Sequence, residues 1–168
     1  MPSIKSALTL GVLVLLLVVG VAWGVAQVSK PFPGKVDRPI CVETSYQAGE
    51  RLYPQDVTVS VLNASKREGL AGRTMQALVD EGFARGQSGN APEGTNVPRA
   101  QVWTTDADNP AVLLVRSRFR KAEVIETPDP GAVGIVVVVG DNLPDSLAKG
   151  RPSILAKDST VVCGPDLG

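Results

Sequence analysis

The sequence predicts a small α/β domain with one mixed sheet and two helices, preceded by an N-terminal transmembrane helix. Three observations predict this fold class. Residues 7–28 carry no charge, short β-branched segments recur through the rest of the chain, and two of the intervals between those segments have helical character. The chain has 168 residues, so the part that follows the apolar segment has room for one modest domain.

The composition excludes several classes of protein. Seventeen basic residues balance seventeen acidic ones, so no bulk charge indicates nucleic-acid binding. The chain has no histidine, which removes the commonest general base and the commonest transition-metal ligand. No pair of catalytic carboxylates is identifiable from spacing. We therefore predict a protein that is not an enzyme and that needs no metal or cofactor.

Residues 7–28 are predicted to form a transmembrane anchor that follows a short tail over residues 1–6. A helix rises about 1.5 Å per residue, so this uncharged stretch is long enough to cross a hydrocarbon core of about 30 Å. The alternative is a cleaved signal peptide, because Gly24 and Ala26 form a small-x-small pattern. Gly20 and Gly24 also form a G-x-x-x-G pattern, so self-association of the span is a further hypothesis.

Two observations disagree over the side of the membrane on which the domain lies. Three basic residues closely follow the span, and the positive-inside rule would keep the domain in the cytoplasm: Lys30, Lys35 and Arg38. However, Cys41 and Cys163 stand near the two ends of the post-membrane region, which suggests one disulfide in an exported domain. We expect an extracytoplasmic domain whose tail, residues 144–168, is tied back by this disulfide. The alternative is two unrelated buried thiols.

Residues 29–55 are predicted to be a stalk followed by the first short strand. The part from Ser29 to Pro39 is rich in proline, which resists both helix and central strand. A short strand is expected around Cys41, and residues 159–164 are expected to bring Cys163 back to the fold.

The predicted domain over residues 56–143 opens with a strand and a helix. Val57–Leu62 is β-branched and alternates as a strand does. Ser65 to Glu68 has the S-x-x-E form of a capping box, so the helix is expected to begin with Ser65 as its N-cap. Its buried stripe is Ala71, Met75, Leu78 and Val79. Gly82 is expected to end the helix in a left-handed conformation, with Phe83 packing back onto it.

The second half of the domain is expected to add three strands and one helix. Residues 85–98 are rich in Gly, Asn and Pro and are predicted to be a mobile loop. Strands are expected over 100–105, 122–127 and 135–139, and the last is apolar on both faces, so we expect it to be central and covered on both sides. A helix is predicted from Pro110 to about Phe119, with a cap residue directly before the proline.

Four motifs resemble the LytR C-terminal domain over about residues 56–143. They are V-L-N at 61–63, G-L-A at 69–71, Leu78 with Gly82-Phe83, and Gly140-Asp141 after an apolar strand. The resemblance is to the stand-alone, membrane-anchored form found in actinobacteria. It implies an outward-facing envelope protein without the LytR-CpsA-Psr phosphotransferase domain, for which this chain is too short. We expect a binding or scaffold module that contributes to envelope integrity, with wall-building proteins or wall polymer as partners.

One candidate ligand site lies at the turn after the first strand. It comprises Asn63, Ser65, Lys66 and Arg67, together with Asp141 after the central strand. A helix N-terminus offers free N–H groups to an anion, and such a site would suit a phosphate- or anion-handling envelope enzyme, the alternative function. The segment matches neither a dinucleotide fingerprint nor a P-loop, and capping alone explains these residue types.

A second candidate is the basic run formed by Arg116, Arg118, Arg120 and Lys121. It is hypothesised to bind anionic wall polymer or phospholipid head groups. The favoured alternative is that these cations stabilise a helix C-terminus, where positive charge is favourable whatever the ligand.

Overall fold

The computed structural model describes residues 11–21, 23 and 41–165. The chain divides into two compact units, residues 1–37 and 38–168. In the first unit, residues 11–21 are helical and exposed. Within the described residues, no helix is both long enough and apolar enough to cross a membrane. The predicted anchor at 7–28 lies partly outside the described residues and the predicted stalk at 29–39 lies wholly outside them, so both stay predictions.

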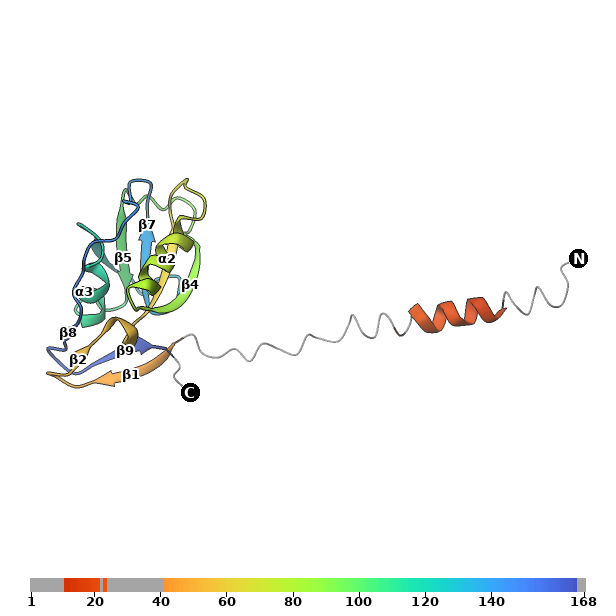
Figure 1. The fold of residues 1–168 in the computed structure, drawn as a ribbon, viewed down its shortest axis with the longest axis horizontal. Coiled ribbons are helices and arrows are strands. Elements are labelled where there is room, and N and C mark those ends of the chain that lie inside the picture. Colours follow the sequence, from red (N-terminus) through yellow and green to blue (C-terminus); the bar gives the residue numbers. More distant parts are fainter. Residues whose placement is uncertain (1–10, 22, 24–40, 166–168) are drawn as a thin grey trace, which may run out of the picture. The chain divides into compact units, whose positions relative to one another are not determined.

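The second unit contains nine strands, two α-helices and one 3-10 helix within its described residues (Figure 1). In chain order these elements are β1 (Val42–Tyr46), β2 (Arg51–Leu52), η1 (Pro54–Asp56), β3 (Thr58–Asn63), α2 (Leu70–Asp80), β4 (Ala84–Asn90), β5 (Ala100–Thr104), α3 (Pro110–Arg116), β6 (Glu123–Glu126), β7 (Ile135–Val139), β8 (Ile154–Leu155) and β9 (Thr160–Gly164).

Five strands form a mixed sheet in the order β4-β3-β7-β5-β6. Strand β3 is parallel to β4 and β7, whereas β5 is antiparallel to β7 and parallel to β6. The central strand β7 is buried along its whole length, as its uninterrupted apolar sequence predicts. The prediction of a small mixed-sheet α/β domain is confirmed.

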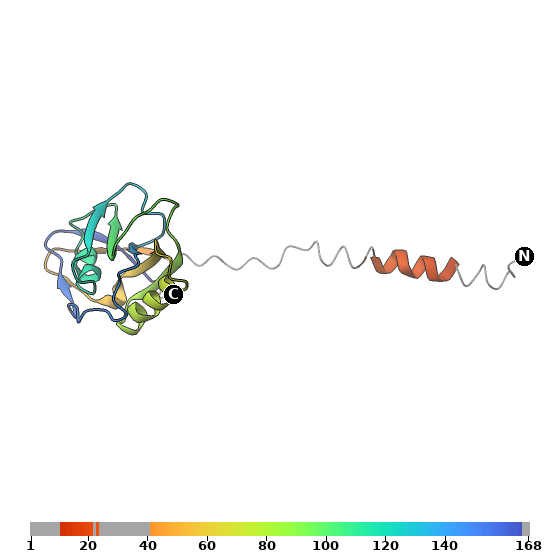
Figure 2. The ribbon, with the colours of Figure 1, turned by 90° about the horizontal axis from the view of Figure 1, so that it is seen from above.

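The two α-helices cover the same face of this sheet. Alternate side chains of β3 and β7, such as Val61 and Val137, join one core with Met75 and Leu78 of α2 and Leu114 of α3. Figure 2 views the domain from above and places α2 and α3 on one side of the strands. Both helices therefore stabilise the sheet by burying apolar area, at about 1.5–3 kcal/mol for each large side chain.

Among the described residues of the domain, loops and no helix cover the opposite face of the sheet. Leu62, Val136 and Val138 point to this side and pack with Val97 in a second, smaller core. The partly buried Trp103 packs against the same cluster. Strand β7 is thus covered on both sides, by helices on one face and by loops on the other.

The predicted start of the first helix of the domain is wrong. Helix α2 begins at Leu70, and its N-cap is Gly69, which has a left-handed φ of 69° and makes no side-chain cap hydrogen bond. The Ser65 hydroxyl is used elsewhere, because it donates to Asn63 Oδ1 and accepts from the Arg67 N–H. Glycine supplies the backbone conformation by which the chain enters the helix.

The predicted end of the same helix is confirmed. Gly82 follows the C-cap with φ of 95°, and Phe83 is buried. The N–H groups of Gly82 and Phe83 donate to the carbonyls of Val79 and Leu78, which is the Schellman arrangement.

Helix α3 begins as predicted but ends earlier. Asn109 is its N-cap and accepts a hydrogen bond from the Ala111 N–H at 3.0 Å, and Pro110 occupies the first helical position. The helix ends at Arg116, and residues 117–119 continue as turns.

The prediction of a mobile loop over residues 85–98 is wrong for its first part. Residues Ala84–Asn90 form β4, an edge strand that pairs in parallel with β3. Its side chains are largely polar and exposed, so the strand shows no hydrophobic alternation. The backbones approach closely at Gly86, where a Cβ atom would lie 2.8 Å from the carbonyl oxygen of Val59.

Strands β1 and β9 form a separate antiparallel ribbon, called here the β1–β9 ribbon, at one end of the sheet (Figure 1). The predicted disulfide between Cys41 and Cys163 is present, with the two Cα atoms 5.2 Å apart. Strands β2 and β8 form a second short ribbon. The disulfide therefore links the beginning of the described domain to its end, as the cysteine positions predict.

Candidate functional site

The predicted ligand-binding turn, residues 63–67, is closed by hydrogen bonds of its own. Asn63 Oδ1 accepts from the Ser65 N–H at 2.9 Å and from the Ser65 hydroxyl at 2.7 Å. Asn63 Nδ2 donates to the Arg67 carbonyl at 2.9 Å. The amide and hydroxyl side chains thus fold the turn onto itself.

Asp141 meets this turn as predicted, although it acts as an acceptor for the turn. Its Oδ1 accepts a hydrogen bond from the Lys66 N–H at 2.9 Å. Arg67 donates to the Leu143 carbonyl at 2.8 Å and forms an ion pair with Asp145. The structure therefore brings all five candidate residues together at the carboxyl ends of β3 and β7.

This arrangement differs from an anion site at a helix N-terminus. A carboxylate already lies against the Lys66 N–H, and α2 begins only at Leu70. Lys66 itself is exposed. The contacts favour a structural role for the turn, and anion binding by these residues stays a prediction.

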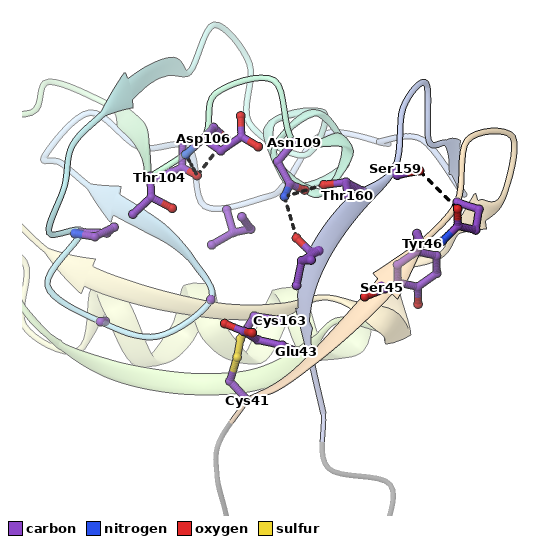
Figure 3. A pocket seen from close by; sticks show the side chains of 17 residues that line it. Cys41, Glu43, Ser45, Tyr46, Thr104, Asp106, Asn109, Ser159, Thr160 and Cys163 are labelled. Carbon is purple, nitrogen blue, oxygen red and sulfur yellow. Dashed lines mark hydrogen bonds between the residues drawn. A yellow bond between two sulfur atoms is a disulfide. The ribbon is translucent and has the colours of Figure 1, made fainter.

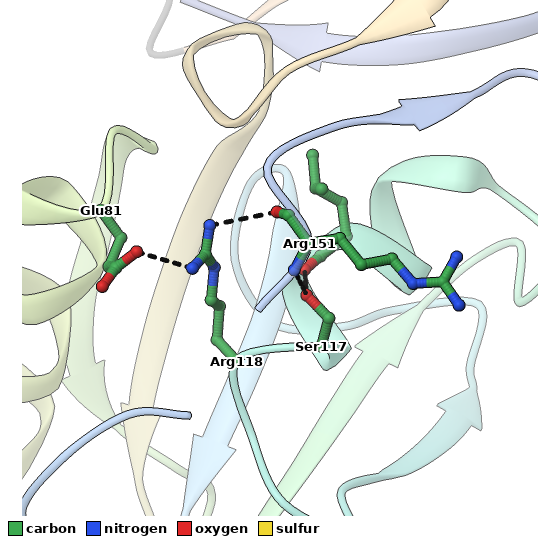
Figure 4. A network of polar contacts seen from close by, with 5 residues as sticks. Glu81, Ser117, Arg118 and Arg151 are labelled. Carbon is green, nitrogen blue, oxygen red and sulfur yellow. Dashed lines mark hydrogen bonds and ion pairs between the residues drawn. The ribbon is translucent and has the colours of Figure 1, made fainter. Parts of the chain in front are cut away.

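The four members of the predicted basic patch do not share one surface. Arg116, Arg120 and Lys121 are exposed, whereas Arg118 is only 5% exposed. Arg118 donates to Glu81 at 2.6 Å and to the Arg151 carbonyl at 3.2 Å (Figure 4). Its guanidinium also lies over the Phe83 ring, 5.7 Å from the centroid. A polymer on the surface therefore has no access to Arg118.

Arg118 instead joins three segments of the domain. Glu81 belongs to the end of α2, Arg118 follows α3, and residues 148–151 form the loop that covers both. The Ala148 N–H donates to the Arg118 carbonyl at 2.8 Å, and the Arg151 N–H donates to Ser117 Oγ at 2.9 Å. The sequence carries no signal for this role, because the partners of Arg118 are distant in the chain.

A cleft of about 710 Å³ lies between the β1–β9 ribbon and one end of the main sheet (Figure 3). Its walls come from four segments, which are residues 41–47 and 159–163 of the ribbon region, residues 104–109 at the end of β5 and beyond, and residues 130–135, which lead into β7. These residues lie at the opposite end of β7 from the turn at 63–67. The sequence did not predict this cleft, because no single segment carries a signal for it.

One face of the ribbon supplies the first wall. Side chains alternate along a strand, so Cys41, Glu43 and Ser45 share one face of β1, and the register places Cys163 and Val161 beside them. All five line the cleft. On the other face of the ribbon, Val162 is buried and Tyr46 contacts the core.

The opposite wall is fixed by hydrogen bonds at the start of α3. Thr104 Oγ1 donates to the Asp106 carbonyl and accepts from the Asp106 N–H. Asn109, which caps α3, donates to the Val161 carbonyl at 2.9 Å and to Thr160 Oγ1 at 3.3 Å. Asn109 thereby holds β9 against the end of the sheet.

The cleft is polar and negatively charged. Glu43 and Asp106 line it, and no lysine or arginine is among the described residues of its walls. Burial raises the pKa of the Tyr46 phenol, and the carboxylates of Asp56 and Glu50 raise it further, so Tyr46 stays neutral and keeps its hydroxyl hydrogen. Within the described ranges, no group of three or more carboxylate or cysteine side chains is placed to hold a metal ion.

The geometry defines a small mixed-sheet α/β domain with a disulfide-tied ribbon across one end of its sheet. The chain belongs to the family described as LytR cell envelope-related transcriptional attenuator, whose profile matches residues 56–142. The resemblance drawn from the V-L-N and G-L-A motifs is confirmed.

A solved structure shares this fold. It is the crystal structure of the soluble domain of a conserved hypothetical secreted protein from Mycobacterium marinum, with a TM-score of 0.50 and 24% sequence identity. The alignment covers 63% of this chain and 80% of that chain. Among curated proteins, none matches this chain significantly.

Proposed function

We propose that this protein is a membrane-anchored, extracytoplasmic module that contributes to cell-envelope integrity without catalysis, by binding wall-building proteins or wall polymer. Membership of a family described as cell envelope-related supports the envelope role. The uncharged stretch at residues 7–28 supports the anchor.

The disulfide between Cys41 and Cys163 is the main observation in support of an extracytoplasmic location. Disulfides persist in oxidising compartments and are rare in the cytosol. This one links residues separated by 122 positions. In the chain-entropy model, a bridge over so long a loop stabilises the fold by roughly 5 kcal/mol. The relative from Mycobacterium marinum is described as secreted, which agrees with the same location.

The binding role rests on the surfaces that the domain offers. The five residues at the turn, 63–67 with Asp141, spend most of their polar groups on one another. The cleft, by contrast, is open and lined by charged and polar side chains. A module with a formed cleft and with no histidine suits binding better than acid–base catalysis.

Location is tested on protein isolated from its native membrane without reductant. Thiol alkylation followed by mass analysis reads the state of both cysteines and the position of the N-terminus. We expect one bridge and an uncleaved chain. Two alkylated cysteines would contradict the extracytoplasmic location, and a new N-terminus near residue 27 would contradict the anchor.

The envelope role is tested by deleting the gene in the source organism and measuring the entry of a fluorescent dye that an intact envelope excludes. We expect increased entry, reversed by the full chain. A form in which residues 1–28 are replaced by a cleavable signal peptide separates anchoring from export. Unchanged dye entry in the deletion strain would contradict the proposed role.

A phosphate- or anion-handling enzyme is the second candidate function. The place of the turn favours it, because Lys66 and Arg67 lie at the carboxyl ends of the parallel strands β3 and β7, where open α/β sheets bind ligands. An activity on a phosphorylated envelope precursor that Asp141→Asn abolishes, with an unchanged unfolding midpoint, would support this candidate. An activity that survives the substitution would dismiss the site.

A further inference from the structure

We propose that the cleft between the β1–β9 ribbon and the main sheet binds a cationic saccharide, a sugar chain that carries free amino groups. This inference names a ligand class for the binding role proposed above and rests on that role.

The size and the construction of the cleft suit a small ligand. Its volume of about 710 Å³ falls within the range of ligand sites, about 300–1,000 Å³. The ribbon wall is tied by the disulfide at one end and by Asn109 to β9 at the other. A ligand would therefore meet walls that are already in place, which lowers the entropic cost of binding.

The negative charge of the cleft determines which charge its ligand carries. Glu43 on the ribbon and Asp106 on the opposite wall both line the cleft (Figure 3), and neither has a lysine or arginine beside it among the described wall residues. A cleft lined by one sign of charge concentrates ligands of the opposite sign. An anionic ligand would be repelled, whereas an ammonium group would gain charge-assisted hydrogen bonds with these carboxylates.

The remaining lining groups suit a polyhydroxylated ligand. Ser45, Thr105 and Ser159 offer hydroxyl groups, each of which both donates and accepts, and Gln47 offers an amide. The hydroxyls of a sugar have the same dual capacity. An apolar ligand would offer no partner to the Ser45 and Thr105 hydroxyls, at about 1–3 kcal/mol for each group. Val161, half exposed at the cleft, provides an apolar contact for the C–H surface of a sugar ring.

The orientation of the ribbon favours a saccharide over an extended basic peptide. A peptide that adds to a sheet pairs with the free backbone edge of a strand. The ribbon turns a face toward the cleft, so Glu43, Ser45 and Val161 present side chains there. A sugar amine donates hydrogen bonds to side-chain carboxylates, and sugar hydroxyls exchange hydrogen bonds with side-chain hydroxyls.

The test is isothermal titration calorimetry on the purified full chain in detergent. The probes are three tetrasaccharides of graded charge, namely deacetylated chitotetraose, N-acetylchitotetraose and a hyaluronan tetramer. These probes are cationic, neutral and anionic, respectively. We expect the cationic probe to bind at least tenfold more tightly than the neutral one, with affinity falling as salt rises, and the anionic probe not to bind.

Isosteric variants assign the binding to the cleft. Glu43→Gln and Asp106→Asn should each weaken binding of the cationic probe about tenfold, since each removes one charge-assisted contact. Glu123→Gln on β6 is the matched control, because Glu123 is an exposed glutamate that does not line the cleft, and it should leave binding unchanged. Ser45→Trp, on an exposed position of the ribbon face, should abolish binding by filling the cleft.

Several results would overturn the assignment. The first two are that no tetrasaccharide binds and that the anionic probe binds most tightly. The third is that Glu123→Gln weakens binding as much as Glu43→Gln and Asp106→Asn do. The fourth is that a tri-lysine peptide binds more tightly than the cationic probe and displaces it. Complementation keeps the two proposals separate. A chain that restores the dye barrier yet binds no tetrasaccharide overturns the ligand class alone. If the purified chain binds the cationic probe but deletion of the gene leaves the dye barrier intact, the envelope role alone is overturned.

Discussion

The Arg118 guanidinium lies 2.6 Å from the Glu81 carboxylate and joins the C-terminal ends of the two α-helices. The Arg118 side chain is 6% exposed and that of Glu81 is 43% exposed, so the pair is screened by solvent from one side only. Arg118 therefore has a structural role, whereas water still solvates the partly exposed Glu81 carboxylate.

Arg118→Met should lower the free energy of unfolding by about 2 kcal/mol. The substitution removes the ion pair, the hydrogen bond to the Arg151 carbonyl and the stacking on Phe83, while Glu81 remains partly hydrated. Urea unfolding followed by circular dichroism measures the change. Arg120→Met is the matched control, since Arg120 is exposed, and we expect a change within about 0.5 kcal/mol. Equal effects at the two positions would contradict the structural role.

Two glycines near the ends of α2 should respond to alanine with opposite signs. Gly82 has φ of 95°, so Gly82→Ala should destabilise the protein by about 1–2 kcal/mol. Gly72 lies in the helix on an exposed position with open space around its Cα, so Gly72→Ala should stabilise the protein by about 0.5–1 kcal/mol. Thermal unfolding of the two variants measures both changes. A stabilising Gly82→Ala would show that the helix does not end there.

Loss of the disulfide should destabilise the fold and open the cleft. The double variant Cys41→Ser with Cys163→Ser should lose about 2–5 kcal/mol, because the unfolded chain regains the entropy that the bridge removes. Urea unfolding of the variant and of the oxidised protein gives the difference, and Ser159→Ala serves as a control on the same ribbon region. Hydrogen exchange should speed up first in β1 and β9. Identical midpoints for the variant and the oxidised protein would contradict the prediction.

Tyr46 should make the fold sensitive to alkaline pH. Burial, followed by Asp56 and Glu50, raises the pKa of the folded protein's phenol above its ordinary value near 10. The folded state therefore keeps the proton longer than the unfolded chain does. The corresponding stability is complete below the unfolded pKa and is lost as the pH rises through the folded pKa. Tyr46→Phe should flatten the fall in unfolding free energy above about pH 10. An unchanged slope in Tyr46→Phe would contradict this prediction.

Local patterns in the sequence determined much of the main sheet and the ends of its helices. The uninterrupted valines of 135–139 predicted a buried central strand, since a strand with no polar face has to be covered on both sides. Gly82 and Asn109 predicted a helix end and a helix start because each satisfies the backbone within a few residues. The two cysteines predicted the bridge, because there was only one way to pair them.

Other features needed the tertiary structure because their causes are not local. Ser65 fits a capping box, but its hydroxyl and Gly69 serve a longer turn that Asp141 completes from the loop after β7. Strand β4 has no apolar alternation, and it is a strand because the β3 backbone lies alongside it.

From the sequence, Arg118 is expected to be an exposed basic residue. The fold buries it and brings Glu81 and the Arg151 carbonyl into hydrogen-bond contact with it. The cleft depends on segments that are distant in the chain and that meet only when the ribbon folds against the end of the sheet. The sequence by itself thus determined the elements whose hydrogen bonds and buried faces are set by near neighbours. Only the tertiary structure decided the contacts whose partners are far apart along the chain, because those depend on how the elements pack.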